Sequence, residues 1–217
     1  MSVNISKNIN LQYFLTILLL MFIDGFVAPQ VSTSKAVLAD LNWQIVLIAN
    51  TIYFSLIGLA LIFFMVRKTK LLKTLLLIIT TFMTLVLIDD VRTLMLNLAV
   101  QKNAVAVLMD AFLMWVFNVV LFTVWYWTLD RNGVENRNSD IRPDIIFPQE
   151  DNQIKGWKDW KPGFLDYLFF SFYSCMALSP TETVVLSKKM KLLLMIQTSI
   201  SLVVLAMIAA RAINLID

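Results

Sequence analysis

The chain of 217 residues contains no histidine, a single cysteine and only five glycines. Without histidine it cannot form a Ser-His-Asp triad, use a histidine general base or build an ordinary zinc site. The lone Cys175 cannot form an internal disulfide, and neither of the common glycine-rich phosphate loops is present. Because the carboxylates are scattered and no nucleophile–base pair can be recognised, we expect no enzyme, no cofactor and no metal site.

Charge is also scarce in this sequence. Charged residues make up 15% of the chain and apolar residues 59%, and the mean hydropathy is +0.76. Soluble domains have about 25% charged and about 45–50% apolar residues, so a water-soluble globule is excluded. The net charge of +3 comes from short basic clusters beside apolar runs, which favours a membrane surface over nucleic acid. We therefore expect the lipid bilayer to surround this protein.

Long apolar runs occupy most of the chain. The first, Leu11 to Pro29, is interpreted as a span rather than a signal peptide, because it is long and no A-x-A cleavage site follows it. Three further spans are predicted at 44–66, 71–88 and 104–127. We expect Asp89-Asp90 with Arg92 to end the third span as a solvated helix end, and the short, amphipathic stretch 91–100 to lie at the membrane interface.

The C-terminal part has a different pattern. Residues 164–178 are apolar and aromatic, but 15 helical residues rise only about 22 Å, less than the roughly 30 Å hydrocarbon core. A polar segment, 179–183, follows, and then a full span over 192–213. A half-length helix, a polar turn and a full span are typical of a re-entrant pore loop.

These patterns predict an all-α integral membrane protein. It has about five transmembrane helices plus a re-entrant half-helix before the last span, with six spans as the alternative. The predicted regions are a four-helix transmembrane region (1–129), a cytoplasmic linker (130–163) and the re-entrant segment with the last span (164–217). The linker is a domain-like insert, a partner site or a tether.

Basic residues predict the orientation in the membrane. If the N-terminus is cytoplasmic and 164–186 returns to its own side, 14 basic residues lie in the cytoplasm and 4 outside. If 164–186 crosses, the numbers are 12 and 6. Basic residues collect on the cytoplasmic side, so both arrangements place the N-terminus inside the cell. The re-entrant arrangement fits better and places the C-terminus outside.

The polar segment after the half-helix supplies the pore candidates, Ser179, Thr181, Glu182 and Thr183. No glycine occurs within 178–184, so a filter of backbone carbonyls is not expected, and selectivity would come from side chains. A ring of Glu182 carboxylates would favour inorganic cations. The favoured alternative is a capping box, in which Ser179 and Glu182 start the next helix. The two roles can coexist, although an exposed helix N-terminus also attracts anions.

Four polar residues inside apolar spans are further candidates: Asp110, Asn118, Gln197 and Arg211. Ionisable groups at membrane depth are costly and are functional candidates by default. The alternative for Asp110 is a hydrated carboxylate near the membrane boundary. Arg211 either extends to the interface or pairs with Asp24 or Asp110. Gln197 places an amide in the last span, where small residues favour helix packing first and pore lining second.

Two resemblances follow from particular motifs. Phe170-Ser171-Phe172 ahead of the polar segment resembles the pore module of tetrameric potassium-type cation channels, over about twenty residues and without the glycine-containing filter. The C-terminal half is more closely similar to a family of short, uncharacterised bacterial integral membrane proteins. The motifs that carry the second resemblance are 125–131 (WYWTLDR), 147–149 (FPQ), 162–164 (PGF), 179–183 (SPTET) and 210–214 (ARAIN).

These observations predict an ion-channel-like pore protein that conducts cations as a homo-oligomer, such as a tetramer, because one re-entrant loop cannot encircle a pore. One alternative is a small secondary transporter that uses Asp110, Asn118, Glu182 and Arg211 as a polar path. Against it, the halves show no inverted repeat. The other alternative is a non-transporting membrane subunit whose linker, 130–163, binds a partner.

Overall fold

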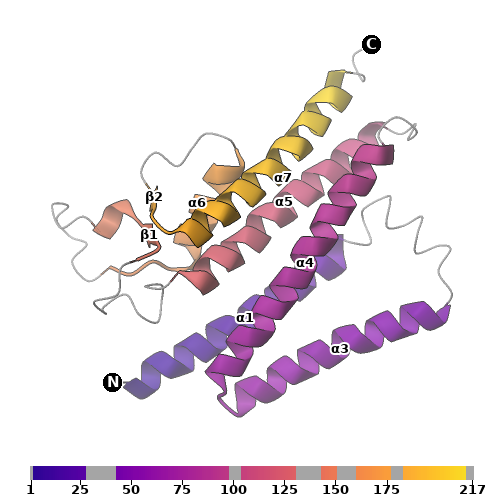
Figure 1. Cartoon of the computed structure of the whole chain (residues 1–217). Coiled ribbons are helices and arrows are strands. Elements are labelled where there is room, and N and C mark those ends of the chain that lie inside the picture. The colour runs from indigo at the N-terminus through magenta and orange to yellow at the C-terminus, as the bar shows by residue number, and fades with distance from the viewer. Residues whose placement is uncertain are drawn as a thin grey trace.

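The computed structural model describes residues 2–27, 43–97, 104–130, 143–150, 160–176 and 183–213. Within these ranges the chain forms six α-helices (Figure 1): α1 (Ser2–Val27), α3 (Trp43–Met65), α4 (Thr69–Asn97), α5 (Ala104–Leu129), α6 (Phe164–Cys175) and α7 (Lys188–Ile213). A 3-10 turn, η1 (Pro148–Glu150), follows the short strand β1 (Ile145–Ile146), which pairs with β2 (Val184–Val185). The predicted all-α class is confirmed.

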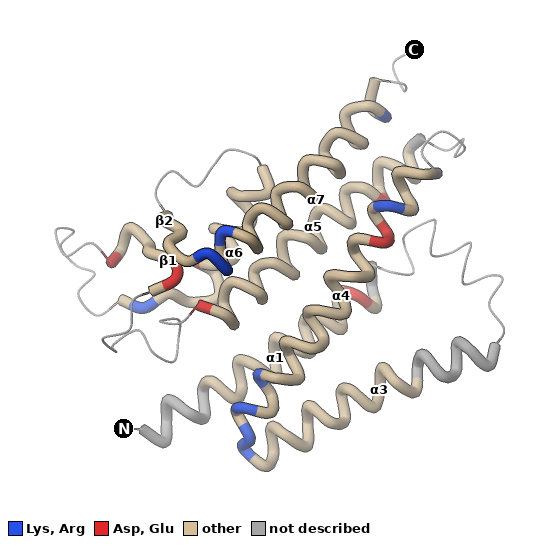
Figure 2. Tube along the Cα trace, viewed as in Figure 1, with Lys and Arg blue, Asp and Glu red and all other residues tan. Residues whose placement is uncertain are grey.

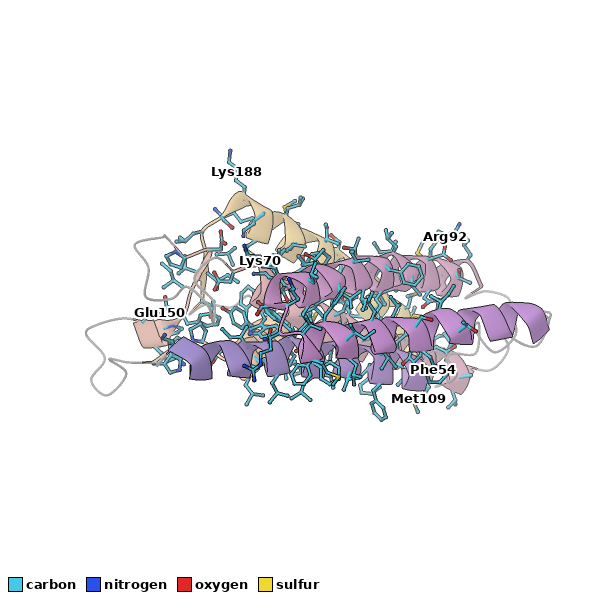
Figure 3. The ribbon with its side chains drawn as sticks, turned by 90° about the horizontal axis from the view of Figure 1, so that it is seen from below. Phe54, Lys70, Arg92, Met109, Glu150 and Lys188 are labelled. Atoms are coloured by element: carbon cyan, nitrogen blue, oxygen red, sulfur yellow. The ribbon has the colours of Figure 1, made fainter. Side chains whose placement is uncertain are left out.

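Three helices are long and apolar enough to cross a membrane. They are α4, α5 and α7, whose apolar segments have mean hydropathies of 2.2 to 2.4. In α1 and α3 the described apolar stretches are shorter, Ile9–Gly25 and Thr51–Met65. Large apolar side chains such as Phe54 and Met109 are more than half exposed on the outside of the bundle (Figure 3). An apolar outer surface suits lipid rather than water, and the prediction of a membrane-embedded protein is confirmed.

Helix α5 lies at the centre of the bundle. It packs against α1, α4, α6 and α7, while α3 lies against α1 and α4 (Figure 1). Its side chains Phe122 and Tyr126 are fully buried, and the ring of Trp127 lies at a tilt of 56° against that of Tyr13 in α1, with ring centroids 5.0 Å apart. The indole of Trp125 donates a hydrogen bond of 3.0 Å to the hydroxyl of Thr84 in α4. The aromatic end of α5 is therefore packed into the protein.

The predicted helix end at Asp89-Asp90 is wrong. Helix α4 continues through both carboxylates to Asn97, so the described part of the stretch after Asp90 forms its last turns. The acidic pair is tolerated because Asp89 is exposed and its Oδ1 lies 3.0 Å from the guanidinium of Arg92, one turn later. Such i,i+3 pairs stabilise a helix rather than end it.

The predicted capping box, residues 179–182, lies outside the described residues, and the last helix begins later in the chain. Helix α7 begins at Lys188, and its cap is Ser187, whose Oγ accepts a hydrogen bond of 3.4 Å from the Met190 amide. The chain before it is extended, because Val184 and Val185 pair with Ile146 and Ile145 in an antiparallel register. The described chain from Thr183 to Ser187 is therefore not helical, and α7 does not extend back toward the capping box.

Most Lys and Arg of the described residues lie at one end of the bundle, which also carries some of the Asp and Glu (Figure 2). Basic residues gather at the end where α1 begins: Arg67, Lys68, Lys70 and Lys73 around the α3–α4 turn, and Lys188, Lys189 and Lys191 at the start of α7. The acidic pair and Arg92 lie in the last third of α4, and Arg211 lies in the last turn of α7, so these residues are toward the opposite end. We call the end of the bundle at which α1 begins the basic end.

Candidate functional site

The short helix α6 packs against α5 and runs antiparallel to it. Its first-turn residue Tyr167 donates a hydrogen bond of 2.7 Å from its hydroxyl to Oδ2 of Asp130, directly after α5. Farther along α6, the ring of Phe172 meets Trp115 in the first half of α5, with ring centroids 5.6 Å apart. Because later residues of α6 meet earlier residues of α5, α6 begins where α5 ends.

The same helix runs parallel to α7. Ser171 in α6 lies beside Gln197, whose Nε2 donates a hydrogen bond of 2.6 Å to its Oγ. One turn later, the carbonyl oxygen of Cys175 accepts a bond of 2.5 Å from the hydroxyl of Ser201. Residue numbers rise together in both helices, so α6 and α7 start at one end of the bundle. Since α6 has 12 residues and extends about 18 Å, it ends beside the middle of α7.

Local sequence explains where α6 starts. Gly163 is its N-cap residue, and the amide of Gly163 donates a bond of 2.6 Å to Oδ2 of Asp166 three residues later. An acidic residue in the first turn also interacts favourably with the helix dipole. Pro162, immediately before this cap, has no backbone N–H, so it leaves no unpaired hydrogen-bond donor at the start of the helix.

One buried amide joins the three helices. The side chain of Gln197 is fully buried, and its Oε1 accepts a hydrogen bond of 2.6 Å from the Tyr126 hydroxyl of α5. Its Nε2 donates to Ser171 and, at 2.9 Å, to the sulfur of Cys175, both in α6. A buried polar side chain is stable in a helix bundle only when its polar atoms are hydrogen-bonded. Both the oxygen and the nitrogen of the Gln197 amide have such partners. Gln197 therefore anchors α6 between α5 and α7.

Asn118 belongs to the same network. It is fully buried in α5, and its Nδ2 donates to the backbone carbonyl of Gln197 at 3.3 Å and to the sulfur of Cys175 at 3.5 Å. Its Oδ1 has no hydrogen-bond partner within the described part of the chain. The fold thus brings together two of the four predicted intramembrane candidates, which lie on different spans.

The other two intramembrane candidates lie elsewhere. Asp110 is in the second turn of α5 and only 1% exposed, so the alternative of a freely hydrated carboxylate is wrong. Arg211 is half-buried in the last turn of α7. Both are outside the network around Gln197. Of the pore candidates, Ser179, Thr181 and Glu182 lie outside the described residues, and Thr183 is half-buried just before β2.

A second group of buried polar residues lies at the basic end. Oδ1 of Asp130 accepts a hydrogen bond of 3.1 Å from the backbone amide of Asp144, in addition to the bond from Tyr167. Nζ of Lys189 lies 2.7 Å from Oδ2 of Asp144 and donates a bond of 2.6 Å to the carbonyl of Leu129. The lysine thus neutralises a carboxylate and satisfies a carbonyl in the last turn of α5.

The backbone completes this group. The carbonyl oxygen of Asp144 accepts a bond of 2.9 Å from the amide of Leu186, next to the β1–β2 pair. The rings of Phe147 and Tyr167 meet edge to face, with centroids 5.2 Å apart. Part of the linker therefore binds the beginnings of both α6 and α7. Sequence reasoning missed the roles of Asp144 and Lys189, because nothing local marks them as partners.

Comparisons with protein-family models, with curated proteins and with solved structures find no match to this chain. No group of three or more potential metal ligands occurs among the residues that the structure describes. The arrangement as it stands holds a half-length helix in a fixed position: Asp130 holds its beginning, and Gln197 and Ser201 hold its second half. What this site does chemically is to hold α6 in place through buried hydrogen bonds.

Proposed function

We propose that this protein is an ion-channel-like pore protein of the cell membrane, in which α6 is a re-entrant half-helix. The observation that carries the proposal is the parallel packing of α6 and α7, both of which begin beside the end of α5. With this course, α6 would enter the membrane from one side, the segment after it would return to that side, and α7 would start from there. The order of outer helix, half-helix, return segment and inner helix is that of the cation-channel pore module it resembles.

The segment between α6 and β2 would then form the constriction. It contains Ser179, Thr181, Glu182 and Thr183, and a ring of Glu182 carboxylates from several copies would attract inorganic cations. One copy cannot surround a conduit, so the proposed assembly is a homo-oligomer such as a tetramer. Gln197 and Asn118 hold the half-helix in this scheme and do not line the conduit, because both are buried within one chain.

The charge distribution supports one orientation in the membrane. The basic end carries Lys and Arg around the α3–α4 turn and at the start of α7, and basic residues favour the cytoplasmic side. We therefore propose a cytoplasmic N-terminus, five spans and an outer C-terminus, with α6 entering from the cytoplasm. The alternative with six spans would place the start of α7 outside the cell.

Cysteine labelling tests the re-entrant course. We use a Cys175→Ser background, whose native cysteine is fully buried, and single cysteines at Lys161, Leu186 and Ala212, which are exposed. A membrane-impermeant maleimide is expected to label Lys161→Cys and Leu186→Cys from the cytoplasmic side and Ala212→Cys from the other side. Labelling of Leu186→Cys from the side opposite Lys161→Cys would show that α6 crosses, and the proposed pore loop would be abandoned.

Conduction tests the function itself. The purified protein is expected to be an oligomer in mild detergent and to give discrete cation-selective currents in planar bilayers. Glu182→Gln is expected to lower the cation-to-anion permeability ratio several-fold, because it removes the ring of carboxylates that would attract cations. Glu150→Gln removes one carboxylate from η1 outside the polar segment and is the matched control, with selectivity unchanged. A monomer, or a stable oligomer without currents, contradicts the proposal.

A further inference from the structure

The turn between α3 and α4 has an unusual backbone. Arg67 has a φ of 55° and is the one non-glycine residue with a positive φ in the described part of the chain. Its amide donates to the carbonyl of Phe64 at 3.1 Å, and the amide of Lys68 donates to that of Phe63 at 3.0 Å. These two nested bonds form a Schellman motif, in which the left-handed position is usually glycine, the residue that adopts it without steric cost. An arginine in that position carries a steric cost, so we look for a role of its side chain.

The turn also carries positive charge without compensation. Arg67, Lys68 and Lys70 are exposed, and none of them has an ion-pair partner among the residues described. The sequence from 41 to 88 contains no Asp or Glu, and the first turn of α4 has no acidic residue. A helix N-terminus is the positive end of the helix dipole, so cations there are unfavourable unless an anion is near.

The surroundings of the turn indicate which anion. Exposed apolar side chains flank the cations on both sides: Met65 is 72% exposed, Val66 59% and Leu71 43%. In a membrane-embedded protein, cations beside exposed apolar groups lie where the hydrocarbon meets the headgroups. The anions concentrated at that depth are lipid phosphates. A guanidinium can bind a phosphate with two parallel hydrogen bonds, which a lysine cannot do.

We propose that the α3–α4 turn, residues 67–70, binds the phosphate of an anionic lipid headgroup. The guanidinium of Arg67 and the ammonium groups of Lys68 and Lys70 surround the phosphate at the N-terminus of α4. This role gives a reason for an arginine in a left-handed position that favours glycine. The proposal rests on charge complementarity and on the backbone of the turn, and it is independent of any conduction by the protein.

The test compares lipid-dependent stability of the purified full chain. Melting temperatures are measured in detergent with added phosphatidylglycerol or phosphatidylcholine. The matched variants are Lys68→Gln/Lys70→Gln in the turn and Lys188→Gln/Lys191→Gln at the start of α7, where both lysines are exposed (Figure 3 shows Lys188 and Lys70). Both variants remove two charges from the basic end. We expect phosphatidylglycerol to stabilise the parent and the α7 variant equally, and the turn variant much less.

Arg67→Gly separates lipid binding from protein stability more clearly. The variant removes the guanidinium and at the same time places a glycine, which adopts a positive φ without steric cost, at this position. Without lipid it is expected to melt no lower than the parent. Its affinity for phosphatidylglycerol is expected to fall at least about tenfold, because the variant loses both charge-assisted hydrogen bonds of the guanidinium and one such bond already contributes about that factor. Three results would overturn the proposal: equal losses in the two double variants, a full phosphatidylglycerol response in Arg67→Gly, or the same stabilisation by inorganic phosphate or phosphatidylcholine.

Discussion

Replacing Lys189 with methionine is expected to lower the free energy of unfolding by about 2 kcal/mol, between the values for exposed and buried ion pairs, because the lysine side chain is 38% exposed. The reason is the position of Asp144, whose side chain is 3% exposed and whose Oδ2 lies 2.7 Å from Nζ of Lys189. Methionine has a similar length but no charge, so the carboxylate would remain buried without this cation. The carbonyl of Leu129 would also lose its donor. Unfolding in mixed micelles of increasing denaturing-detergent content measures the change.

Two variants make this prediction specific. Lys188→Met removes the neighbouring lysine, which is exposed, and should change stability by less than about 0.5 kcal/mol. Lys189→Met combined with Asp144→Asn removes both charges of the pair, so the double variant should be more stable than Lys189→Met alone. If Lys189→Met and Lys188→Met have the same small effect, the group at the basic end does not hold α7 in the way the structure indicates.

Replacing Gln197 with methionine is expected to lower the free energy of unfolding by about 2–5 kcal/mol, because its side chain makes hydrogen bonds to Tyr126, Ser171 and Cys175 and such bonds between membrane helices are each worth roughly 0.6–1.7 kcal/mol. Methionine nearly preserves the volume, so the loss comes from polar groups and little from a cavity. The hydroxyls of Tyr126 and Ser171 would lose partners at 2.6 Å in a fully buried site. The neighbouring Thr198→Val is the control, because Thr198 Oγ1 donates only to carbonyls of its own helix.

A double-mutant cycle with Tyr126→Phe tests the mechanism of that loss. Tyr126→Phe alone removes the hydroxyl that donates to Oε1 of Gln197. In the Gln197→Met background the same substitution should cost less, because its partner is already gone. Additive losses would mean that the two residues act on stability independently, contrary to the bond between them. Thermal unfolding of all four proteins in one detergent gives the coupling free energy.

Both predictions concern the placement of α6, on which the proposed pore depends. Tyr167 ties its beginning to Asp130, and Gln197 holds it in the middle. Variants that loosen only the Gln197 network leave the contacts at the basic end intact. If the pore proposal holds, Gln197→Met should therefore alter conduction at a temperature where the protein is still folded.

Much of the architecture could be predicted from periodicity and composition. The apolar runs predict the helices closely, because each run is a local property of about twenty consecutive residues. The half-length of α6 follows from the aromatic stretch that begins at Phe164. The two boundary errors arose where short-range rules competed. Asp89-Asp90 predict a helix end, but α4 continues past them and Arg92 pairs with Asp89. The capping box predicts the start of the next helix near Ser179, whereas α7 begins at Lys188, after the extended chain of β2.

The sequence by itself determined that this chain is helical, that it is embedded in a membrane and that Asn118 and Gln197 are polar groups in apolar surroundings. Only the tertiary structure decided what these groups contact. Tyr126 and Gln197 are 71 positions apart, and Lys189 and Leu129 are 60 apart. Hydropathy and capping act over a few residues, whereas the pairing of distant polar groups depends on which helix faces meet. Burial then makes these pairings costly to break, because a buried polar group that loses its partner has no other partner nearby.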